Sequence, residues 1–281
     1  MNVILLGSTG YIGSEFARIS MQRGHVITPL DYREVVQKER WFSDFVQKEH
    51  WFSDFDLVVN CAAYIPKPSV SLCDQNEVET VNGNVRLPFK LACICERKDV
   101  PLVHFSTACL FDENREYAES DKPLRGFKDH CGWYVGTKLM AEELVGNIEK
   151  HYILRIRLPF DEQAGERNYL SKIIAYPKVY DHLNSLTHRA DCMNAALDLV
   201  ERKAPFGTYN LTNPGSISAR RVCDKMLAAG LLTKMPEFVP GPCTGTTLSV
   251  DKLLSAGVKI RPVEEAVDDA IKNWRPKCSI A

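Results

Sequence analysis

The sequence predicts an α/β fold built on a doubly wound parallel sheet, and two patterns support this prediction. Short apolar runs alternate with longer helical patterns through the first half of the chain. A glycine-rich turn follows the first apolar run directly. Strands that alternate with helices form parallel sheets with crossover helices, and such sheets bind ligands outside the carboxyl ends of their strands.

The individual elements follow from these patterns. We expect strands at residues 3–6, 26–30, 57–60, 102–106 and 152–156, and a sixth at 207–211. Helical patterns cover residues 12–23, 34–54, 74–98, 133–150 and 189–203. The alternation breaks at 157–188 and 212–281, which carry much of the proline and glycine. We therefore expect a Rossmann-type core over 1–156 and a smaller substrate lobe over 157–281, from which 189–211 returns to the sheet.

Composition excludes several classes of protein. The chain has 281 residues, of which 45% are hydrophobic and 25% charged, as in globular proteins in water. Its formal net charge of −1 offers no electrostatic basis for binding nucleic acid or an anionic membrane. No apolar stretch reaches the ~18 residues of a membrane span. The first strand starts so early that no signal peptide is expected, which predicts a cytoplasmic location.

The ten cysteines and seven histidines do not suggest a metal centre. The sequence contains no Cys-x-x-Cys pair, and the histidines do not combine with the cysteines in a ligand spacing. Four of the cysteines, Cys61, Cys93, Cys95 and Cys223, lie in apolar or helical settings, where a thiol packs as a small hydrophobe. We expect reduced thiols and no bound metal.

The glycine-rich turn predicts a site for the pyrophosphate of a dinucleotide. Gly7, Gly10 and Gly13 lie between the first expected strand and the first expected helix. Glycines let backbone N–H groups approach phosphates closely, and the helix N-terminus adds its partial positive charge. Glycine spacing alone is weak evidence. The later strands and the pair described next strengthen it.

Tyr134 and Lys138 stand four residues apart in an expected helix and therefore share one face. A tyrosine with a pKa of ~10 is a poor proton donor near neutral pH, but a neighbouring ammonium lowers that pKa. Tyr134 could then give a proton to a carbonyl oxygen as a hydride arrives. Ser106 and Thr107 end the preceding strand, where a third hydroxyl group is expected.

These motifs resemble the extended short-chain dehydrogenase/reductase family over nearly the whole chain. The run 106–111 is similar to the dTDP-4-dehydrorhamnose reductase branch, with a Ser-Thr pair and Phe111 four residues after the threonine, which implies Thr107 as the triad hydroxyl. The resemblance implies these cofactor-binding positions: Gly7, Thr9, Gly10, Tyr11, Ile12, Gly13, Asp31, Arg33, Cys61, Ala62, Ala63, Asn84, Tyr134 and Lys138.

A narrower resemblance is to the bifunctional 3,5-epimerase/4-reductases that make nucleotide-linked L-rhamnose. The similar stretches are 107–111, 126–128, 154–159, 167–173 and 209–215. In that family a cysteine two residues after the catalytic threonine and a lysine in an Arg-Asn-x-x-x-Lys segment support epimerisation. The matching residues here are Cys109 and Lys172, and Arg167 and Asn168 are expected to hold the substrate.

The two activities share one chemical requirement. In a 4-keto-6-deoxyhexose, carbons 3 and 5 both flank the ketone, so removing either proton places negative charge on the same oxygen. Tyr134 and Thr107 aimed at that oxygen would stabilise the enolate and later assist reduction at carbon 4. Inversion needs a base on one face and an acid on the other. Cys109 and Lys172 suit these roles, and the sequence leaves open which is which.

Cofactor and substrate remain open at this level. After the second strand, Asp31 favours NAD and Arg33 favours NADP. NADP(H) is preferred because the resemblance is to biosynthetic reductases, and NAD(H) is the alternative. The substrate is a UDP- or dTDP-linked keto sugar. Two other functions are a reductase without epimerase activity and a non-catalytic NADP-binding regulatory subunit, which the intact Thr107, Tyr134 and Lys138 disfavour.

A tandem duplication interrupts the second helical pattern. Residues 36–45 recur at 46–55 with only Arg40 replaced, by His50. A repeat this short does not indicate a solenoid. We expect a tolerated surface insertion. A homodimer contact through exposed Trp and Phe side chains of the extra copy is the alternative.

Overall fold

The computed structural model describes residues 1–31, 52–241 and 244–276. They form two compact units. The first comprises 1–110, 122–155 and 203–209, and the second comprises 111–121, 156–202 and 210–281. The chain passes from one unit to the other after Arg155, within a residue or two of the expected boundary.

The first unit is built on a six-stranded sheet with the order β11-β6-β4-β3-β1-β2. The strands are β1 (Asn2–Leu6), β2 (Val26–Leu30), β3 (Leu57–Asn60), β4 (Leu102–Thr107), β6 (His151–Ile156) and β11 (Gly207–Asn210). β1 pairs in parallel with β2 and β3, and β3 pairs in parallel with β4. The predicted α/β fold class is confirmed.

The order of the strands indicates where a sheet of this kind would bind a ligand. From β1 the chain proceeds to β2 on one side and to β3 on the other, so the switch point lies between β1 and β3. Leu6 pairs with Asn60 at the carboxyl ends of these strands. Both strands are buried along nearly their whole length, because helices cover both faces of the sheet.

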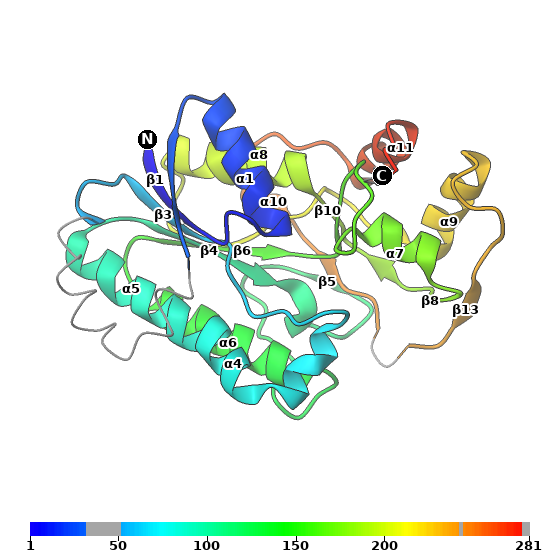
Figure 1. Cartoon of the computed structure of the whole chain (residues 1–281), viewed down its shortest axis with the longest axis horizontal. Helices are drawn as coiled ribbons and strands as arrows, with labels where there is room; N and C mark the ends of the chain where they lie inside the picture. The colour runs from blue at the N-terminus through cyan, green and yellow to red at the C-terminus, as the bar shows by residue number, and fades with distance from the viewer. Residues whose placement is uncertain (32–51, 242–243, 277–281) are drawn as a thin grey trace, which may run out of the picture. The chain divides into compact units, whose positions relative to one another are not determined.

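Figure 1 shows α1 (Tyr11–Gln22) on one face of this sheet and α4 (Glu77–Val81), α5 (Leu87–Lys98) and α6 (Gly132–Gly146) on the other. The expected helix 74–98 is divided. A 3-10 turn (Val70–Gln75) and a π turn (Asn82–Arg86) flank α4. A Cβ atom at Gly83 would lie 2.8 Å from Cβ of Tyr64, so the chain approaches this helix closely at the π turn.

The second unit has its own core. It holds α7 (Tyr169–Ala175), α8 (Arg189–Glu201), α9 (Ala219–Ala228), α10 (Asp251–Ser255) and α11 (Val263–Lys272). Short strand pairs connect its segments: β7 (Pro159–Phe160) with β10 (Thr187–His188), β8 (Lys178–Tyr180) with β13 (Glu237–Val239), β9 (Leu183–Asn184) with β12 (Ile217–Ser218), and β5 (Glu116–Tyr117) with β14 (Thr247–Leu248). Phe160, Ile173 and Val267 belong to one buried apolar cluster there.

Two segments lie in a different unit from the one expected. Residues 111–121 belong to the second unit, where β5 pairs with β14 and Phe111 stacks on Tyr117 at 4.3 Å between ring centroids. Helix α8 also belongs to the second unit, and only 203–209 return to the first. Both differences depend on contacts between residues far apart in sequence.

The duplication lies mainly outside the described residues, which exclude 32–51, and Arg33 is among the excluded positions. The end of the second copy is described. Phe52 is 1% exposed and packs in the core of the first unit with Leu87 and Leu91, and Phe55 packs against the same cluster. Phe52 therefore does not supply the exposed aromatic surface on which the homodimer alternative depends. Across the described residues, no helix combines the length and the apolar character needed to span a membrane.

Candidate active site

The glycine turn between β1 and α1 forms a tight backbone cradle. Gly7 has φ +76°, which favours glycine, and its carbonyl oxygen accepts a 2.9 Å hydrogen bond from the N–H of Gly10. A Cβ atom at Gly13 would lie 2.1 Å from that oxygen. No side chain caps α1, and its first turn holds no acidic residue. The turn therefore has the backbone geometry and the helix N-terminus that fit a dinucleotide pyrophosphate.

The other predicted cofactor positions near the turn are placed as follows. Thr9 is exposed, Tyr11 and Ile12 are half-buried in the first turn of α1, and Asp31 is exposed just beyond β2. The segment after β3 abuts the cradle, because a Cβ atom at Gly7 would lie 2.7 Å from the backbone nitrogen of Ala62. Cys61 also reaches β1, where its N–H donates to Leu6. The predicted positions after β1 and after β3 thus come together.

Asn84 holds the segment after β3 against the helices. Its Oδ1 accepts a 2.7 Å hydrogen bond from the N–H of Tyr64, and its Nδ2 donates to the Tyr64 carbonyl at 3.2 Å. Nδ2 also donates to Oγ1 of Thr137 at 3.4 Å, on α6. Asn84 therefore has a structural role in the described residues, and its contact with a cofactor stays a prediction.

The predicted triad lies on elements that pack directly together. Lys138 is 2% exposed, and its Nζ donates a 2.7 Å hydrogen bond to the carbonyl oxygen of Phe105 on β4. Tyr134 lies one turn earlier on α6 and is 8% exposed. Thr107 ends β4, and its Oγ1 accepts a 3.1 Å hydrogen bond from the N–H of Cys109, which leaves the hydroxyl proton for another acceptor.

The surroundings of Lys138 shift its proton affinity. Burial lowers the pKa of Lys138 to about 8, against the opposing influence of Glu142 and Cys61. Burial also raises the pKa of the Cys61 thiol, so that this thiol is uncharged near neutral pH. Nε2 of His104 lies 3.3 Å from Lys138 Nζ, and burial together with the Lys138 charge lowers the pKa of His104 well below its ordinary value.

Cys109 follows Thr107 in a 3-10 turn (Ala108–Leu110) and is half-buried. Hydrogen bonds hold both the N–H and the carbonyl group of its backbone. Its N–H donates to Thr107, and its carbonyl oxygen accepts a 3.3 Å hydrogen bond from Nη1 of Arg125. The turn fixes the backbone position from which the side chain of Cys109 projects.

The substrate-binding residues expected at 167–172 belong to the second unit. Lys172 lies on α7 and is half-buried, and burial and then the charge of Arg167 lower the pKa of its ammonium. Asn168 is fully buried and caps α7, because its Oδ1 accepts a 2.9 Å hydrogen bond from the N–H of Leu170. Its Nδ2 also donates to Oδ1 of Asp161 at 2.8 Å.

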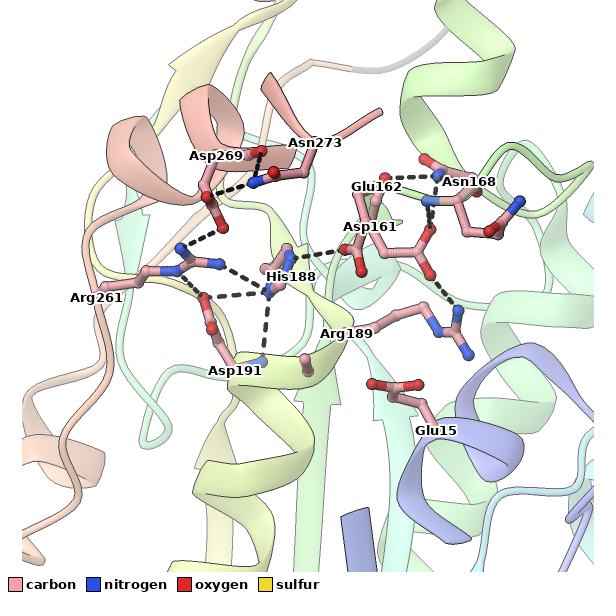
Figure 2. Close-up of polar contacts among 12 residues, drawn as sticks. Glu15, Asp161, Glu162, Asn168, His188, Arg189, Asp191, Arg261, Asp269 and Asn273 are labelled. Carbon is pink, nitrogen blue, oxygen red and sulfur yellow. Dashed lines mark hydrogen bonds and ion pairs between the residues drawn. The ribbon is translucent and has the colours of Figure 1, made fainter. Parts of the chain in front are cut away.

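Figure 2 shows Asn168 within a larger polar network. Asp161 bonds to Asn168 on one side and to Arg189, at the start of α8, on the other. Asp191 accepts a 2.7 Å hydrogen bond from Nε of Arg261 and lies 3.2 Å from Nδ1 of His188. The network fixes the N-terminus of α7, and with it the helix that carries Lys172. Contact between Asn168 and a substrate stays a prediction.

Two buried residues were missed by the sequence analysis. His104 contacts Lys138, and Arg125 holds the carbonyl of Cys109. His104 had a signal in the sequence, since a histidine interrupts the apolar run of β4 and a buried polar residue needs a partner. Arg125 had none, because a charged residue in a loop is usually solvated.

Comparisons with known proteins identify the family and the fold of this chain. A bifunctional dTDP-4-dehydrorhamnose 3,5-epimerase/dTDP-4-dehydrorhamnose reductase from Arabidopsis thaliana is 31% identical over 233 residues, covering 79% of this chain and 73% of that protein. The crystal structure of the L780 UDP-rhamnose synthase from Acanthamoeba polyphaga mimivirus has a TM-score of 0.83 at 22% identity and covers 97% of this chain and 99% of that chain.

A dTDP-4-dehydrorhamnose reductase from Bacillus anthracis, solved in complex with NADP, has a TM-score of 0.79 at 18% identity, covering 98% of this chain and 99% of that chain. These two structures show a shared fold. The model of the RmlD substrate binding domain family matches residues 1–278. The chain therefore belongs to the RmlD substrate-binding domain family.

Proposed function

We propose that this chain is an NADPH-dependent reductase of a UDP- or dTDP-linked 4-keto-6-deoxy sugar that also epimerises carbons 3 and 5, yielding the L-rhamnose nucleotide. The observation that carries the proposal is the buried hydrogen bond from Lys138 to Phe105. It joins the helix that carries Tyr134 to the strand that ends at Thr107. The printed activities of the Arabidopsis relative support the same assignment.

The residues that would hold the cofactor are those of the cradle and of the segment after β3. Gly7, Gly10 and Gly13 would receive the pyrophosphate, and Lys138 the nicotinamide end. NADPH supplies the hydride when it is bound. NADP(H) is the proposed cofactor because the family resemblance is to biosynthetic reductases, and NAD(H) is the alternative, since similar solved structures hold either NADP or NAD.

The chain's own residues would manage protons and charge at the ketone. Tyr134 would donate its phenol proton to the carbonyl oxygen, and a positive charge on Lys138, one turn further along the helix, would favour this transfer. The Thr107 hydroxyl, which keeps a proton to donate, would hydrogen-bond to the same oxygen. Both donors stabilise the negative charge that develops there in either reaction.

Epimerisation requires a base and an acid, for which we propose Cys109 and Lys172. Burial and Arg167 lower the pKa of Lys172, which raises the neutral fraction of the amine near physiological pH. Cys109 offers a thiol on a turn anchored at both its N–H and its carbonyl group. The alternative is a reductase without epimerase activity, which would depend on a separate epimerase.

Deuterium exchange tests the two activities separately. When purified protein is incubated with the keto sugar nucleotide and NADPH in deuterium oxide, the sugar should incorporate deuterium at carbons 3 and 5 and NADPH should be oxidised. Cys109→Ala should lose exchange yet still reduce the pre-epimerised 4-keto-L-rhamnose nucleotide. Cys93→Ala, at a half-buried cysteine on α5, is the matched control and should keep both activities. Undiminished exchange in Cys109→Ala would exclude this thiol, and turnover of only the pre-epimerised substrate would favour the reductase alone.

A further inference from the structure

A buried chain of polar side chains stands behind Lys138 in the first unit. Asn60 at the end of β3 and His104 in β4 are fully buried, and Lys138 on α6 is 2% exposed. Polar groups buried this completely require hydrogen-bond partners, and here the side chains serve one another. The order of the contacts runs from Asn60 through His104 to Lys138.

Donor and acceptor roles fix the direction of this chain. The backbone N–H of Ala62 can only donate, and it donates to Oδ1 of Asn60 at 3.1 Å. The amide NH₂ of Asn60 therefore faces His104, with Nδ2 3.0 Å from Nδ1. An NH₂ group only donates, so Nδ1 must accept. A neutral His104 then carries its proton on Nε2.

The proton on Nε2 points toward an amine. Nε2 lies 3.3 Å from Nζ of Lys138. An Nε2–H group and an ammonium are both donors and cannot bond to each other. A neutral amine has a lone pair that accepts from Nε2–H, while one of its own hydrogens still donates to Phe105. The arrangement therefore stabilises the neutral amine relative to the ammonium.

We propose that His104 is a positioning residue for the proposed reductase: with its tautomer set by Asn60, it favours the neutral form of Lys138 and thereby controls the charge next to Tyr134. The tautomer and its effect on Lys138 follow from the buried contacts. Only the consequence for catalysis rests on the proposed function.

Other titratable groups around Lys138 act in the opposite sense or stay neutral. Glu142, one turn further along α6, favours the ammonium, but Arg155 binds its carboxylate. Burial raises the pKa of the Cys61 thiol, so this thiol stays uncharged while Lys138 titrates. Tyr134 lies one turn earlier on the same helix.

The consequence is a dependence of activity on pH. Burial lowers the pKa of Lys138 to about 8, and above that pH the positive charge one helical turn from Tyr134 is lost. Reductase activity should therefore fall on the alkaline side near that value. Weakening the Nε2–H contact should restore the ammonium and move the alkaline limb to higher pH.

The first experiment uses the unliganded wild-type protein. ¹⁵N NMR of the histidine rings, with His104 assigned by its absence in His104→Gln, should show the proton on Nε2 and none on Nδ1. ¹³C NMR of the lysine side chains should show Lys138 titrating well below the exposed lysines. A proton on Nδ1 would overturn the proposal without bearing on the function, since no substrate is involved.

Variants then test the coupling. His104→Leu removes the donor, and His104→Gln can turn an amide oxygen toward the ammonium. The Lys138 midpoint should rise by about one pH unit in the first and by more in the second. Val103→Ala is the matched control, because adjacent residues of a strand point to opposite faces, and it should leave the midpoint in place. An unchanged midpoint in His104→Leu would overturn the proposal.

Kinetics separates the control of Lys138 by His104 from its consequence for catalysis. With the keto sugar nucleotide and NADPH, the alkaline limb of kcat/KM should move upward together with the Lys138 midpoint. If the NMR results are as expected but no preparation turns over the substrate, the proposed function fails and the control of Lys138 by His104 stands. If the midpoint moves and the alkaline limb does not, the catalytic consequence assigned to His104 is wrong.

Discussion

Arg155 on β6 forms a buried, bidentate ion pair with the carboxylate of Glu142 on α6. Its Nη2 donates to Oε2 at 2.7 Å and its Nε donates to Oε1 at 3.1 Å, with both side chains about 6% exposed. Glu142 stands four residues after Lys138 and eight after Tyr134, so all three lie along one side of α6. The ion pair thus anchors to the sheet the same helix face that carries Tyr134 and Lys138, the proposed catalytic pair.

Breaking this ion pair should be costly. Glu142→Gln leaves the Arg155 guanidinium buried without its counter-charge, and we expect a loss of roughly 3–5 kcal/mol in the free energy of unfolding. The matched control is Glu237→Gln in the exposed pair with Lys178, where the cost should stay below about 1 kcal/mol. Urea denaturation of both variants measures the difference, and equal losses would contradict the anchoring role.

Lys138 should make stability depend on pH. Because burial lowers its pKa to about 8, the unfolded chain binds more protons than the folded chain between pH 8 and an ordinary lysine pKa of ~10.4. The free energy of unfolding should therefore rise with pH across that window, by roughly 3 kcal/mol. Below pH 8 the folded protein should remain destabilised by the whole of this amount, because the buried amine is charged.

Lys138→Met isolates this contribution. From pH 8 to 10 the free energy of unfolding of the wild type should rise relative to that of Lys138→Met. Lys234→Met, at an exposed lysine, should track the wild type. A difference that is constant with pH would refute the lowered proton affinity of Lys138.

Two glycine-to-alanine changes should act in opposite directions. At Gly13 the new methyl group would meet the Gly7 carbonyl oxygen, so we expect a loss of roughly 1–3 kcal/mol in stability and NADPH binding weakened by more than about tenfold. At Gly146 the nearest atom is 3.8 Å away, so Gly146→Ala should stabilise by ~0.4–1 kcal/mol. Calorimetric titration and thermal unfolding report both effects. Normal NADPH binding by Gly13→Ala would argue against the cradle.

Arg167 should tune Lys172. Burial and the Arg167 charge lower the Lys172 pKa, so Arg167→Gln should raise the pH midpoint of deuterium exchange by up to about one unit and slow exchange at neutral pH. Arg167→Lys keeps the positive charge and should leave the midpoint nearly unchanged. Exchange rates measured by NMR across pH 6–10 give the midpoints, and identical profiles for the two variants would remove Arg167 from this role.

Asn168 should contribute more stability than an ordinary helix cap. Asn168→Ala removes the cap of α7 and also the hydrogen bond to the Asp161 carboxylate, so the expected loss is about 2–4 kcal/mol. Ser218→Ala removes only the cap of α9 and should cost about 1 kcal/mol. Chemical denaturation compares them. If the two losses are equal, the network drawn in Figure 2 adds nothing to the cap.

Much of the fold follows from short-range patterns. The strands at 26–30 and 57–60 have the expected bounds, because each is a short apolar run, and β3 at 57–60 is buried along its whole length. The glycine turn was equally predictable, since the cradle depends on backbone geometry that side chains would block. The division of the expected helix 74–98 was not, because it depends on the approach of Tyr64 to Gly83.

The sequence by itself predicted which residues carry the chemistry. Tyr134 and Lys138 were named from their types and spacing, and Thr107, Cys109 and Lys172 from the family resemblance. Only the tertiary structure decided what surrounds them. Asn60 and His104 stand 44 residues apart in the chain, and His104 and Lys138 a further 34. The protonation of a buried group depends on partners brought together by folding, and no local pattern along the chain records that proximity.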